Sequence, residues 1–193
     1  NEHWHRSLGI TYNKTDKIII KDPAFAHINT ERFNQVLEHE LNHLMINRID
    51  NFHSVPRWFK EGYAMLLANE ITLRHKIKVA RGAAKEKLFK LYELKNFSNL
   101  NYEEYSLAYA QSAIYVESLE QIYGIQIFDI IIELLKDNLK FDDAIAKTVS
   151  PNYEILIKKH ILKKYSWLKL IDFTDILFSV MPLLLVIGFI IKS

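Results

Sequence analysis

Two histidines in residues 36–46, VLEHELNHLMI, are the side chains whose types and spacing first suggest chemistry. His39 and His43 are four residues apart, and Glu40 directly follows the first of them. Because residues i and i+4 share one face of an α-helix, the two imidazoles should project side by side. Two neutral imidazoles one turn apart can bind a single Zn²⁺ ion. In such a site Glu40 would lie beside the metal and act on a water molecule.

The surrounding residues favour a helix from Glu31 to about Asn47, with Thr30 as its N-cap and Glu31 in its first turn. Apolar residues give this helix a broad buried surface: Phe33, Val36, Leu37, Leu41, Leu44 and Met45. A structural interpretation therefore stands beside the metal site. In it, the two histidines are partly buried in the helix and hydrogen-bonded.

A third candidate ligand lies in residues 55–66, VPRWFKEGYAML, where Pro56 can begin a second helix. A catalytic zinc ion usually takes three protein ligands and leaves a fourth position for water, and Glu61 would complete such a set. Seventeen residues separate His43 from Glu61, enough for a helix end, a loop and a returning helix. Taken alone, Glu61 is better interpreted as a solvated charge near a helix N-terminus, and only together with the two histidines does it become a candidate ligand.

Together the two stretches resemble the gluzincin metallopeptidases, and most of all the peptidase MA-like group. In that pattern a His-Glu-x-x-His helix is followed by a Trp-x-x-Glu-Gly-x-Ala helix, and this chain has HELNH and then WFKEGYA. The resemblance implies that His39, His43 and Glu61 are zinc ligands and that Glu40 is the general base. The spacing of 17 is slightly shorter than in the thermolysin and aminopeptidase branches, so the branch stays open. The same resemblance places an edge strand, residues 18–21, beside the cleft.

Tyr109 is a candidate oxyanion donor by resemblance to the aminopeptidase branch, in which a Tyr-x-Lys-Gly-Ala run begins a similar helix. Here the run is Tyr-Ala-Gln-Ser-Ala at residues 109–113, so the small residues match and the Lys-Gly pair does not. A hydroxyl in that position could stabilise the charge of the tetrahedral state. The alternative is one more aromatic side chain on a helix that also carries Tyr105, Tyr115 and Tyr123.

Composition sets the outer limits on fold and function. The chain has 193 residues, of which 49% are hydrophobic and 25% charged, a normal globular balance. Its net charge of +2 argues against a dedicated nucleic-acid binder. Without cysteine, neither disulfides nor cysteine-ligated metals are possible.

We expect an α+β fold that is mostly helical, with a small sheet, the zinc helix and an all-α lobe. Residues 8–12 and 17–21 read as strands, and helices are expected at 71–79, 83–94, 106–123, 126–137, 141–147 and 151–165. The expected division is a zinc-binding catalytic lobe over 1–70, a helical lobe over 71–167 and a membrane anchor over 170–191. Only about thirty residues precede the zinc helix, little for the full sheet of gluzincins, so the catalytic lobe is expected to be reduced or incomplete at its N-terminal side.

The anchor is expected from residues 176–191, sixteen residues without a charge. As a helix they would span about 24 Å, against roughly 30 Å for a hydrocarbon core, so a buried core helix or a re-entrant helix is the alternative. Lysines before the segment favour a cytoplasmic domain by the positive-inside rule, whereas similar peptidases are usually exported. We expect a single-pass C-terminal anchor with an extracytoplasmic catalytic domain. The lysines could also rest on anionic lipid headgroups.

The sequence therefore predicts a membrane-anchored zinc metallopeptidase that acts on peptides or proteins, contacts the lipid bilayer through its C-terminal helix and binds no nucleic acid. Its oligomeric state and substrate specificity stay open. The main alternative is an inactive peptidase-like scaffold or binding module tethered to the membrane. A membrane-embedded protease is disfavoured, because the zinc helix carries Glu38, Glu40, Asn42 and Asn47.

Overall fold

Helices make up most of the protein. The computed structural model describes residues 8–12, 15–49 and 55–170. The strands among these residues form one antiparallel pair, β1 (Gly9–Tyr12) and β2 (Lys17–Ile20), with Gly9 opposite Ile20 and Tyr12 opposite Lys17. The expected class, mostly helical with a small sheet, is confirmed, and both strands lie within the ranges predicted for them.

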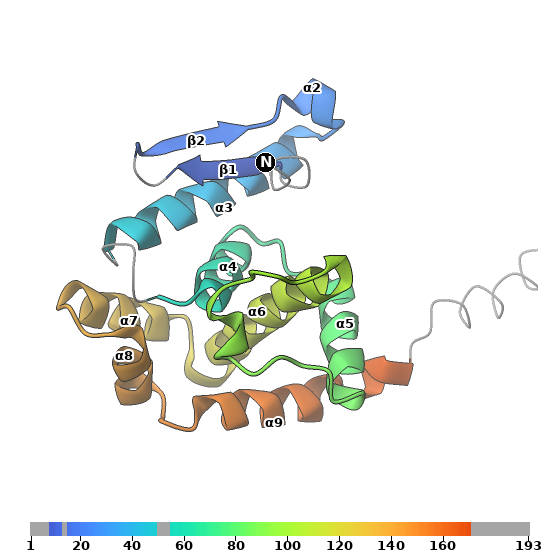
Figure 1. The fold of residues 1–193 in the computed structure, drawn as a ribbon, viewed down its shortest axis with the longest axis vertical. Helices are drawn as coiled ribbons and strands as arrows, with labels where there is room; N and C mark the ends of the chain where they lie inside the picture. Colours follow the sequence, from blue (N-terminus) through green and yellow to red (C-terminus); the bar gives the residue numbers. More distant parts are fainter. Residues whose placement is uncertain (1–7, 13–14, 50–54, 171–193) are drawn as a thin grey trace, which may run out of the picture.

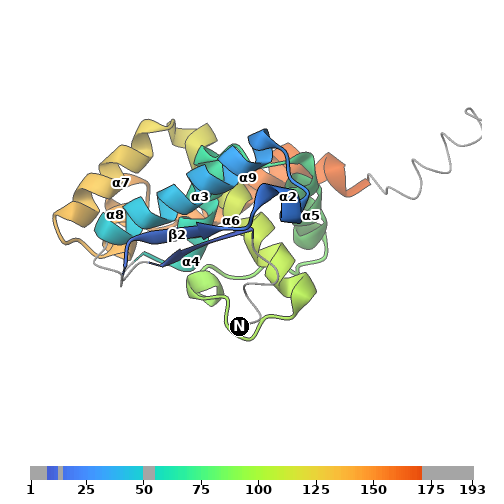
Figure 2. The same ribbon diagram turned by 90° about the horizontal axis from the view of Figure 1, so that it is seen from above.

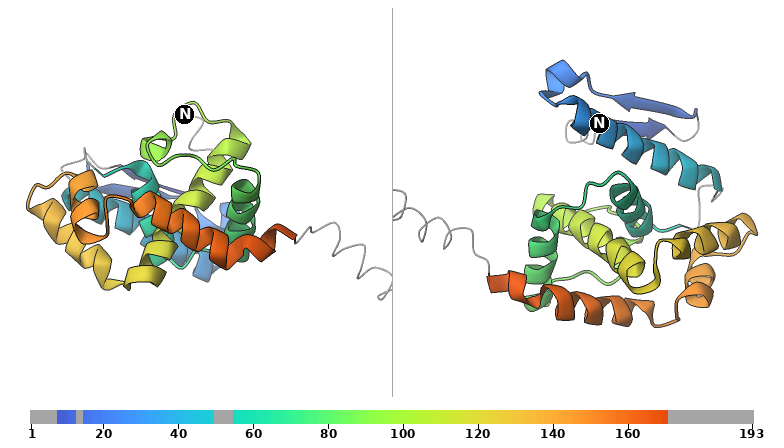
Figure 3. Two further views of the ribbon diagram at one scale, coloured as in Figure 1. Left: turned by 90° about the horizontal axis from the view of Figure 1, so that it is seen from below. Right: turned by 180° about the vertical axis from the view of Figure 1, so that it is seen from behind.

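The elements form two layers, and helix α3 (Thr30–Ile49) lies between the β1–β2 hairpin and the remaining helices (Figure 1). The short helix α2 (Pro23–Ala26) joins β2 to α3, and seen from above the hairpin and α3 cover part of the helices below (Figure 2). Helix α9 (Tyr153–Tyr165) lies on the side of the molecule opposite to the hairpin (Figure 3). The other helical elements are α4 (Arg57–Leu67), α5 (Leu73–Ala84), η1 (Glu93–Lys95), α6 (Tyr102–Tyr123), α7 (Gln126–Lys136), α8 (Phe141–Thr148) and η2 (Ser166–Leu170).

The α3 helix spans the residues expected from its apolar pattern, but its N-terminal cap differs by one residue. The side chain of Asn29, through Oδ1, accepts a hydrogen bond from the backbone N–H of Arg32 at 2.8 Å. Thr30, the expected N-cap, is instead the first helical residue. Both residue types cap helices well, and the sequence places them side by side, so local preference alone did not separate them.

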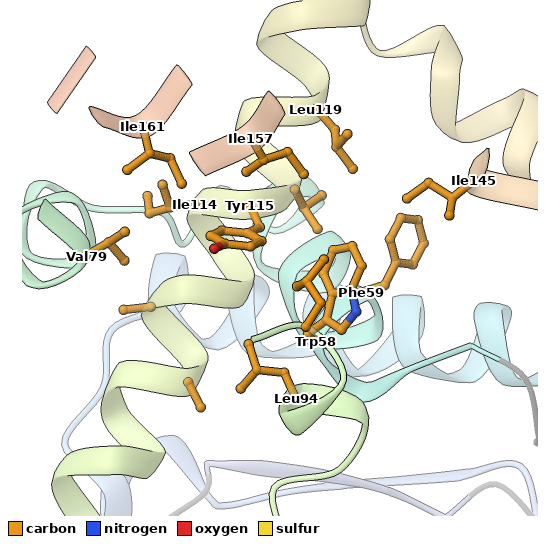
Figure 4. Close-up of a cluster of buried hydrophobic side chains, with 14 of the residues drawn as sticks. Trp58, Phe59, Val79, Leu94, Ile114, Tyr115, Leu119, Ile145, Ile157 and Ile161 are labelled. Carbon is orange, nitrogen blue, oxygen red and sulfur yellow. The ribbon is translucent and has the colours of Figure 1, made fainter. Parts of the chain in front are cut away.

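The core is built around the contact between α4 and α6. Trp58 and Phe59 of α4 are each 1% exposed, and Trp58 packs against Tyr115 of α6 (Figure 4). Both side chains also pack against Phe141 of α8. Burying an aromatic side chain of this size contributes roughly 1.5–3 kcal/mol to folding. The aromatic anchors therefore fix α4 in the core, and with it the position of every other side chain on that helix.

The expected helix over 83–94 is wrong. The α5 helix ends at Ala84, and Glu86 takes a left-handed conformation with a φ of 54°. Beyond it, the backbone N–H and carbonyl of Phe89 both pair with the side-chain amide of Gln111, at 3.0 and 2.7 Å. Gln111 is fully buried on α6, so its amide needs partners, and a non-helical backbone at Phe89 provides both of them.

The other helices lie close to their expected ranges. The α6 helix begins earlier, at Tyr102, because Asn101 and Glu104 form a capping box. Gly124 ends it as expected, with a φ of 84°. The last helix begins at Tyr153 rather than at residue 151, because Ser150 Oγ accepts a hydrogen bond from the N–H of Asn152 in a turn that precedes it.

In the described ranges no helix is long and apolar enough to cross a bilayer. Apart from Leu170, which ends η2, the expected anchor over 170–191 lies outside the described residues. The expected division of the chain into two lobes at residue 70 stays a prediction. One core cluster contains buried residues from both sides of that position.

Gly62 allows α4 and α6 to approach closely. A Cβ atom there would collide with the carbonyl oxygen of Ser112 and lie 2.6 Å from Val116 Cγ2, both on α6. We expect Gly62→Ala to lower the free energy of unfolding by about 1–3 kcal/mol, because backbone cannot move aside as a side chain can. Urea denaturation measures the change.

Gly82→Ala is the matched control on α5. Its Cβ would meet the end of the Leu88 side chain at 2.9 Å, which can move, and alanine is the better helix former. The expected change is within about 1 kcal/mol in either direction. Equal losses at the two glycines would contradict the role given to the α4–α6 contact.

Candidate functional site

Helices α3 and α4 bring the three expected metal ligands together. His39 and His43 lie one turn apart on α3, with ring centroids 4.7 Å from each other. Glu61 projects from α4 towards them, and its Oε2 lies 3.6 Å from His39 Nε2 and 3.3 Å from His43 Nε2. One donor atom from each side chain lies within 4.8 Å of the others. The 17 residues between His43 and Glu61 thus allow the chain to return, so that α4 faces α3.

The donor set fits a divalent metal ion. Neither histidine contact has hydrogen-bond geometry, so Glu61 Oε2 is buried without a hydrogen-bond partner. An unpaired buried polar atom is costly and requires an explanation. Ligands about 2.0–2.2 Å from one tetrahedral ion are themselves roughly 3.3–3.6 Å apart, and Glu61 Oε2 lies at such a distance from the Nε2 atom of each histidine. A cation at this position would satisfy the orphaned oxygen and both Nε2 atoms.

The charges around the three side chains also favour a cation. Burial alone would raise the pKa of Glu61, but His43, His39 and Arg57 outweigh burial and hold this pKa well below its ordinary value. Burial alone would lower the pKa of His39, but Glu61 and Glu70 outweigh it and raise this pKa to about 10. The site therefore keeps carboxylates charged and attracts positive charge, whether a proton or a metal ion supplies it.

Strand β1 positions Glu40. Glu40 Oε2 accepts a hydrogen bond of 2.6 Å from Thr11 Oγ1, which also lies 3.0 Å from the backbone oxygen of Glu40. Gly9 lets the strand approach, because a Cβ there would lie 2.8 Å from Glu40 Cγ. The carboxylate is therefore held in one orientation beside the histidines, by a contact 29 residues away in the chain.

Two of the three donor residues, His43 and Glu61, border a cavity of about 370 Å³. Helices α3 and α4 and strand β1 supply its lining: Thr11, Glu40, His43, Asn47, Arg57, Lys60 and Glu61. The strand residue at the cavity is Thr11 of β1. Residues 18–21, in β2 and directly after it, were expected to flank the cleft but are not among the lining residues. The cavity is large enough for part of a peptide and places Glu40 and Glu61 at one surface.

Comparison with known proteins agrees with this geometry. A model of the peptidase MA superfamily matches residues 2–160. The chain belongs to the peptidase MA superfamily. No curated protein and no solved structure matches it. The resemblance stated from HELNH and WFKEGYA is thereby confirmed at the level of the superfamily, and a metal-dependent peptidase is the activity that this membership suggests.

Within this peptidase MA domain, Tyr109 is not among the residues that line the cavity. Its hydroxyl lies 3.3 Å from Arg57 Nη2 and 3.2 Å from the hydroxyl of Tyr105. Burial raises the pKa of Tyr109 well above its ordinary value, with a further contribution from Glu61, so the hydroxyl keeps its proton. Its role as an oxyanion donor stays a prediction, and the contact found is with Arg57.

Glu70 is a site residue that the sequence did not indicate. Its Oε2 lies 2.7 Å from His39 Nδ1, and its Oε1 accepts a hydrogen bond of 2.6 Å from Arg32 Nη1. Asn69, with a φ of 52°, turns the chain at the end of α4 and returns Glu70 towards α3. In the sequence, the local signal for that turn was the Asn itself, a residue type that tolerates the left-handed conformation after a helix. Such a carboxylate fixes which ring nitrogen of His39 carries the proton, so that Nε2 faces Glu61.

Arg57 is the second residue that sequence reasoning missed. It lies one turn before Glu61 on α4, and its Nε donates to Glu61 Oε1 at 3.0 Å. Burial alone would lower the pKa of Arg57, but the carboxylate outweighs burial and raises it, so the guanidinium is permanently charged. The two oxygens of Glu61 thus face different groups: Oε1 accepts the hydrogen bond from Arg57, and Oε2 faces the two histidines without a hydrogen bond. The i, i+4 spacing of Arg and Glu was a visible but unspecific signal.

We expect Glu70→Ala to weaken binding of a divalent metal ion by about 10- to 100-fold, the usual cost of removing the partner that orients a ligating histidine. Competition between the protein and a chelator for Zn²⁺ measures the dissociation constant. Glu38→Ala, which removes an exposed carboxylate from α3, is the control and should leave it unchanged. Equal affinity in the Glu70 variant and the wild type would show that His39 does not depend on this contact.

Proposed function

We propose that the protein is a zinc metallopeptidase that hydrolyses peptide bonds. The observation that carries the proposal is the convergence of His39, His43 and Glu61 beside a cavity that His43, Glu61 and Glu40 line. Superfamily membership over residues 2–160 supports it independently. Zinc is the metal proposed, because two imidazoles and one carboxylate are a donor set found in catalytic zinc sites.

The number of ligands favours a catalytic site over a structural one. Structural zinc sites are closed by four protein ligands, whereas catalytic sites use three and leave a position open. Among the described residues the donor group has three members, and His43 and Glu61 border the cavity. The open position would then face the space that a substrate can enter.

In this proposal the chain's own residues divide the work. A zinc ion in such a site supplies Lewis acidity, which activates water and polarises the scissile carbonyl. Glu40 accepts a proton from the attacking water and passes it to the leaving amine. Thr11 holds the Glu40 carboxylate at 2.6 Å, and Glu70 orients His39, so neither group has to reorganise during the reaction.

The second candidate is a scaffold that keeps the fold without catalysis. It would bind partners through the cavity and gain nothing from a base beside the ligands. The hydrogen bond from Thr11 to Glu40 argues for the enzyme, because that contact orients a carboxylate that is not one of the three proposed ligands.

We expect Glu40→Gln to retain zinc and the fold but to cleave peptides at least about a hundredfold more slowly, because the amide cannot accept the proton. His39→Ala should lose zinc and activity together. The measurements are zinc content and turnover of peptides from a diverse library. Glu38→Gln, an exposed neighbour on α3, is the control and should match the wild type. Wild-type cleavage that survives Glu40→Gln undiminished would rule out the role given to Glu40.

We also propose that residues 170–191 anchor the protein in a membrane, with the peptidase domain outside the cytoplasm. The apolar composition of residues 176–191 supports the anchor. Four of the lysines that favour a cytoplasmic domain, Lys158, Lys159, Lys163 and Lys164, belong to the folded helix α9. The positive-inside rule counts lysines of short loops, so these carry less weight for orientation.

Deleting residues 171–193 should move the protein from the membrane fraction to the soluble fraction, with its zinc affinity unchanged. The reason is that the deletion removes the apolar segment but none of the residues in the proposed metal site. Cell fractionation and chelator competition measure the two properties. A truncated protein that aggregates or loses zinc would show that the segment belongs to the core instead.

A further inference from the structure

The guanidinium of Arg57 has donors beyond those that hold it in place. Nε donates to Glu61 Oε1 at 3.0 Å, and Nη2 lies 3.2 Å from the Tyr105 hydroxyl and 3.3 Å from that of Tyr109. No described residue forms a hydrogen bond with Nη1. The side chain is 32% exposed and lines the cavity, so a ligand there can reach it.

Aromatic rings hold this guanidinium in a fixed position. Its central carbon lies 4.7 Å from the centre of the Phe97 ring and 5.8 Å from that of Tyr105. A planar guanidinium stacked in this way loses little further freedom when it binds a ligand. The arrangement is more elaborate than an i, i+4 ion pair on a helix requires, because it also draws on α6 and on the loop that precedes α6.

Among the residues that the structure describes, the charged side chains that line the cavity balance before any metal is counted. Arg57 and Lys60 are positive, and Glu40 and Glu61 are negative. Lys60 lies one turn from Arg57 on α4, and its Nζ donates to Asn47 Oδ1 at 2.8 Å. A divalent cation among the three ligands would leave this cavity with a net positive charge. An anionic group on the substrate would restore the balance.

We propose that Arg57, with Lys60 beside it, binds a carboxylate of the substrate next to the scissile bond. The inference rests on the proposed peptidase function and adds the substrate class: peptides with a carboxylate at this position. A guanidinium recognises carboxylates well, because its planar donors match the two oxygens. That carboxylate is either the C-terminus of the peptide or the side chain of an aspartate or glutamate.

Binding to the Glu40→Gln variant with zinc tests the proposal without depending on turnover. The probes are peptides from a diverse library that this variant binds, each compared with two neutral analogues. One analogue carries a C-terminal amide, and the other carries asparagine or glutamine in place of an acidic residue. We expect one analogue to bind about 10- to 100-fold more weakly, the usual loss for a hydrogen-bonded charge. Which analogue is weaker identifies the source of the carboxylate.

Removing the guanidinium should abolish that discrimination. In the Glu40→Gln background, Arg57→Gln should bind the acidic peptide and its neutral analogue within about threefold of each other, and Arg57→Lys should keep part of the preference. Arg48→Gln is the matched control, since Arg48 makes an exposed ion pair with Asp16 at 3.0 Å and does not line the cavity. It should discriminate as strongly as the unmodified background.

The outcomes separate this proposal from the peptidase function. Equal affinity for acidic and neutral peptides, or a preference that survives Arg57→Gln in zinc-loaded protein, overturns the carboxylate site. If Arg57→Gln loses zinc, Arg57→Lys takes its place, and an undiminished preference in that variant overturns the proposal in the same way. A preference for acidic peptides in the binding assay, together with a wild type that cleaves no peptide, would instead refute the peptidase function and keep the carboxylate site.

Discussion

The buried carboxylate of Glu61 is the constraint on which the arrangement of the helices depends. A charged group that leaves water for the protein interior costs several kcal/mol unless charges and hydrogen bonds replace its solvation. Arg57 provides one partner from the same helix, and the two histidines provide the others from α3. Helix α4 therefore cannot shift along α3 without exposing or stranding this charge. Helix α6 takes part as well, because its tyrosines hold Arg57.

Helix α4 meets several requirements at once, which gives its sequence WFKEGYA a physical meaning. Trp58 and Phe59 anchor the helix in the core, and Glu61 points from the other side towards α3. Gly62 follows directly and lets the backbone of α6 come close. A larger residue at that position would push α4 away from α6, and the ligand would move with the helix. Core packing and site geometry are thus set by neighbouring residues of one helix turn.

The sequence predicted what depends on local spacing and missed what depends on contacts between distant residues. The i, i+4 spacing of His39 and His43 requires only a helix, and the helix formed. Glu70 reaches His39 only because of one left-handed residue at the end of α4, so no periodic pattern announces it. The helix expected over 83–94 failed for a related reason. The buried amide of Gln111 bonds the backbone of Phe89, and a partner 22 residues away outweighed local helix preference.

The buried charged side chains between α3 and α4 need an explanation beyond the stability of the fold. Replacing a buried ion pair by well-packed apolar groups is often neutral or stabilising, so buried charges are weak evidence of a structural purpose. Here the charges form a continuous series, from Arg32 through Glu70, His39 and Glu61 to Arg57. An orphaned oxygen within it costs roughly 1–3 kcal/mol by itself. A bound cation would remove that cost. In a scaffold without metal, the unpaired oxygen would destabilise the fold and nothing would compensate for it. The arrangement therefore supports the proposed metal site, whose ligands His39 and Glu61 are held by Glu70 and Arg57, over a mere means of joining α3 to α4.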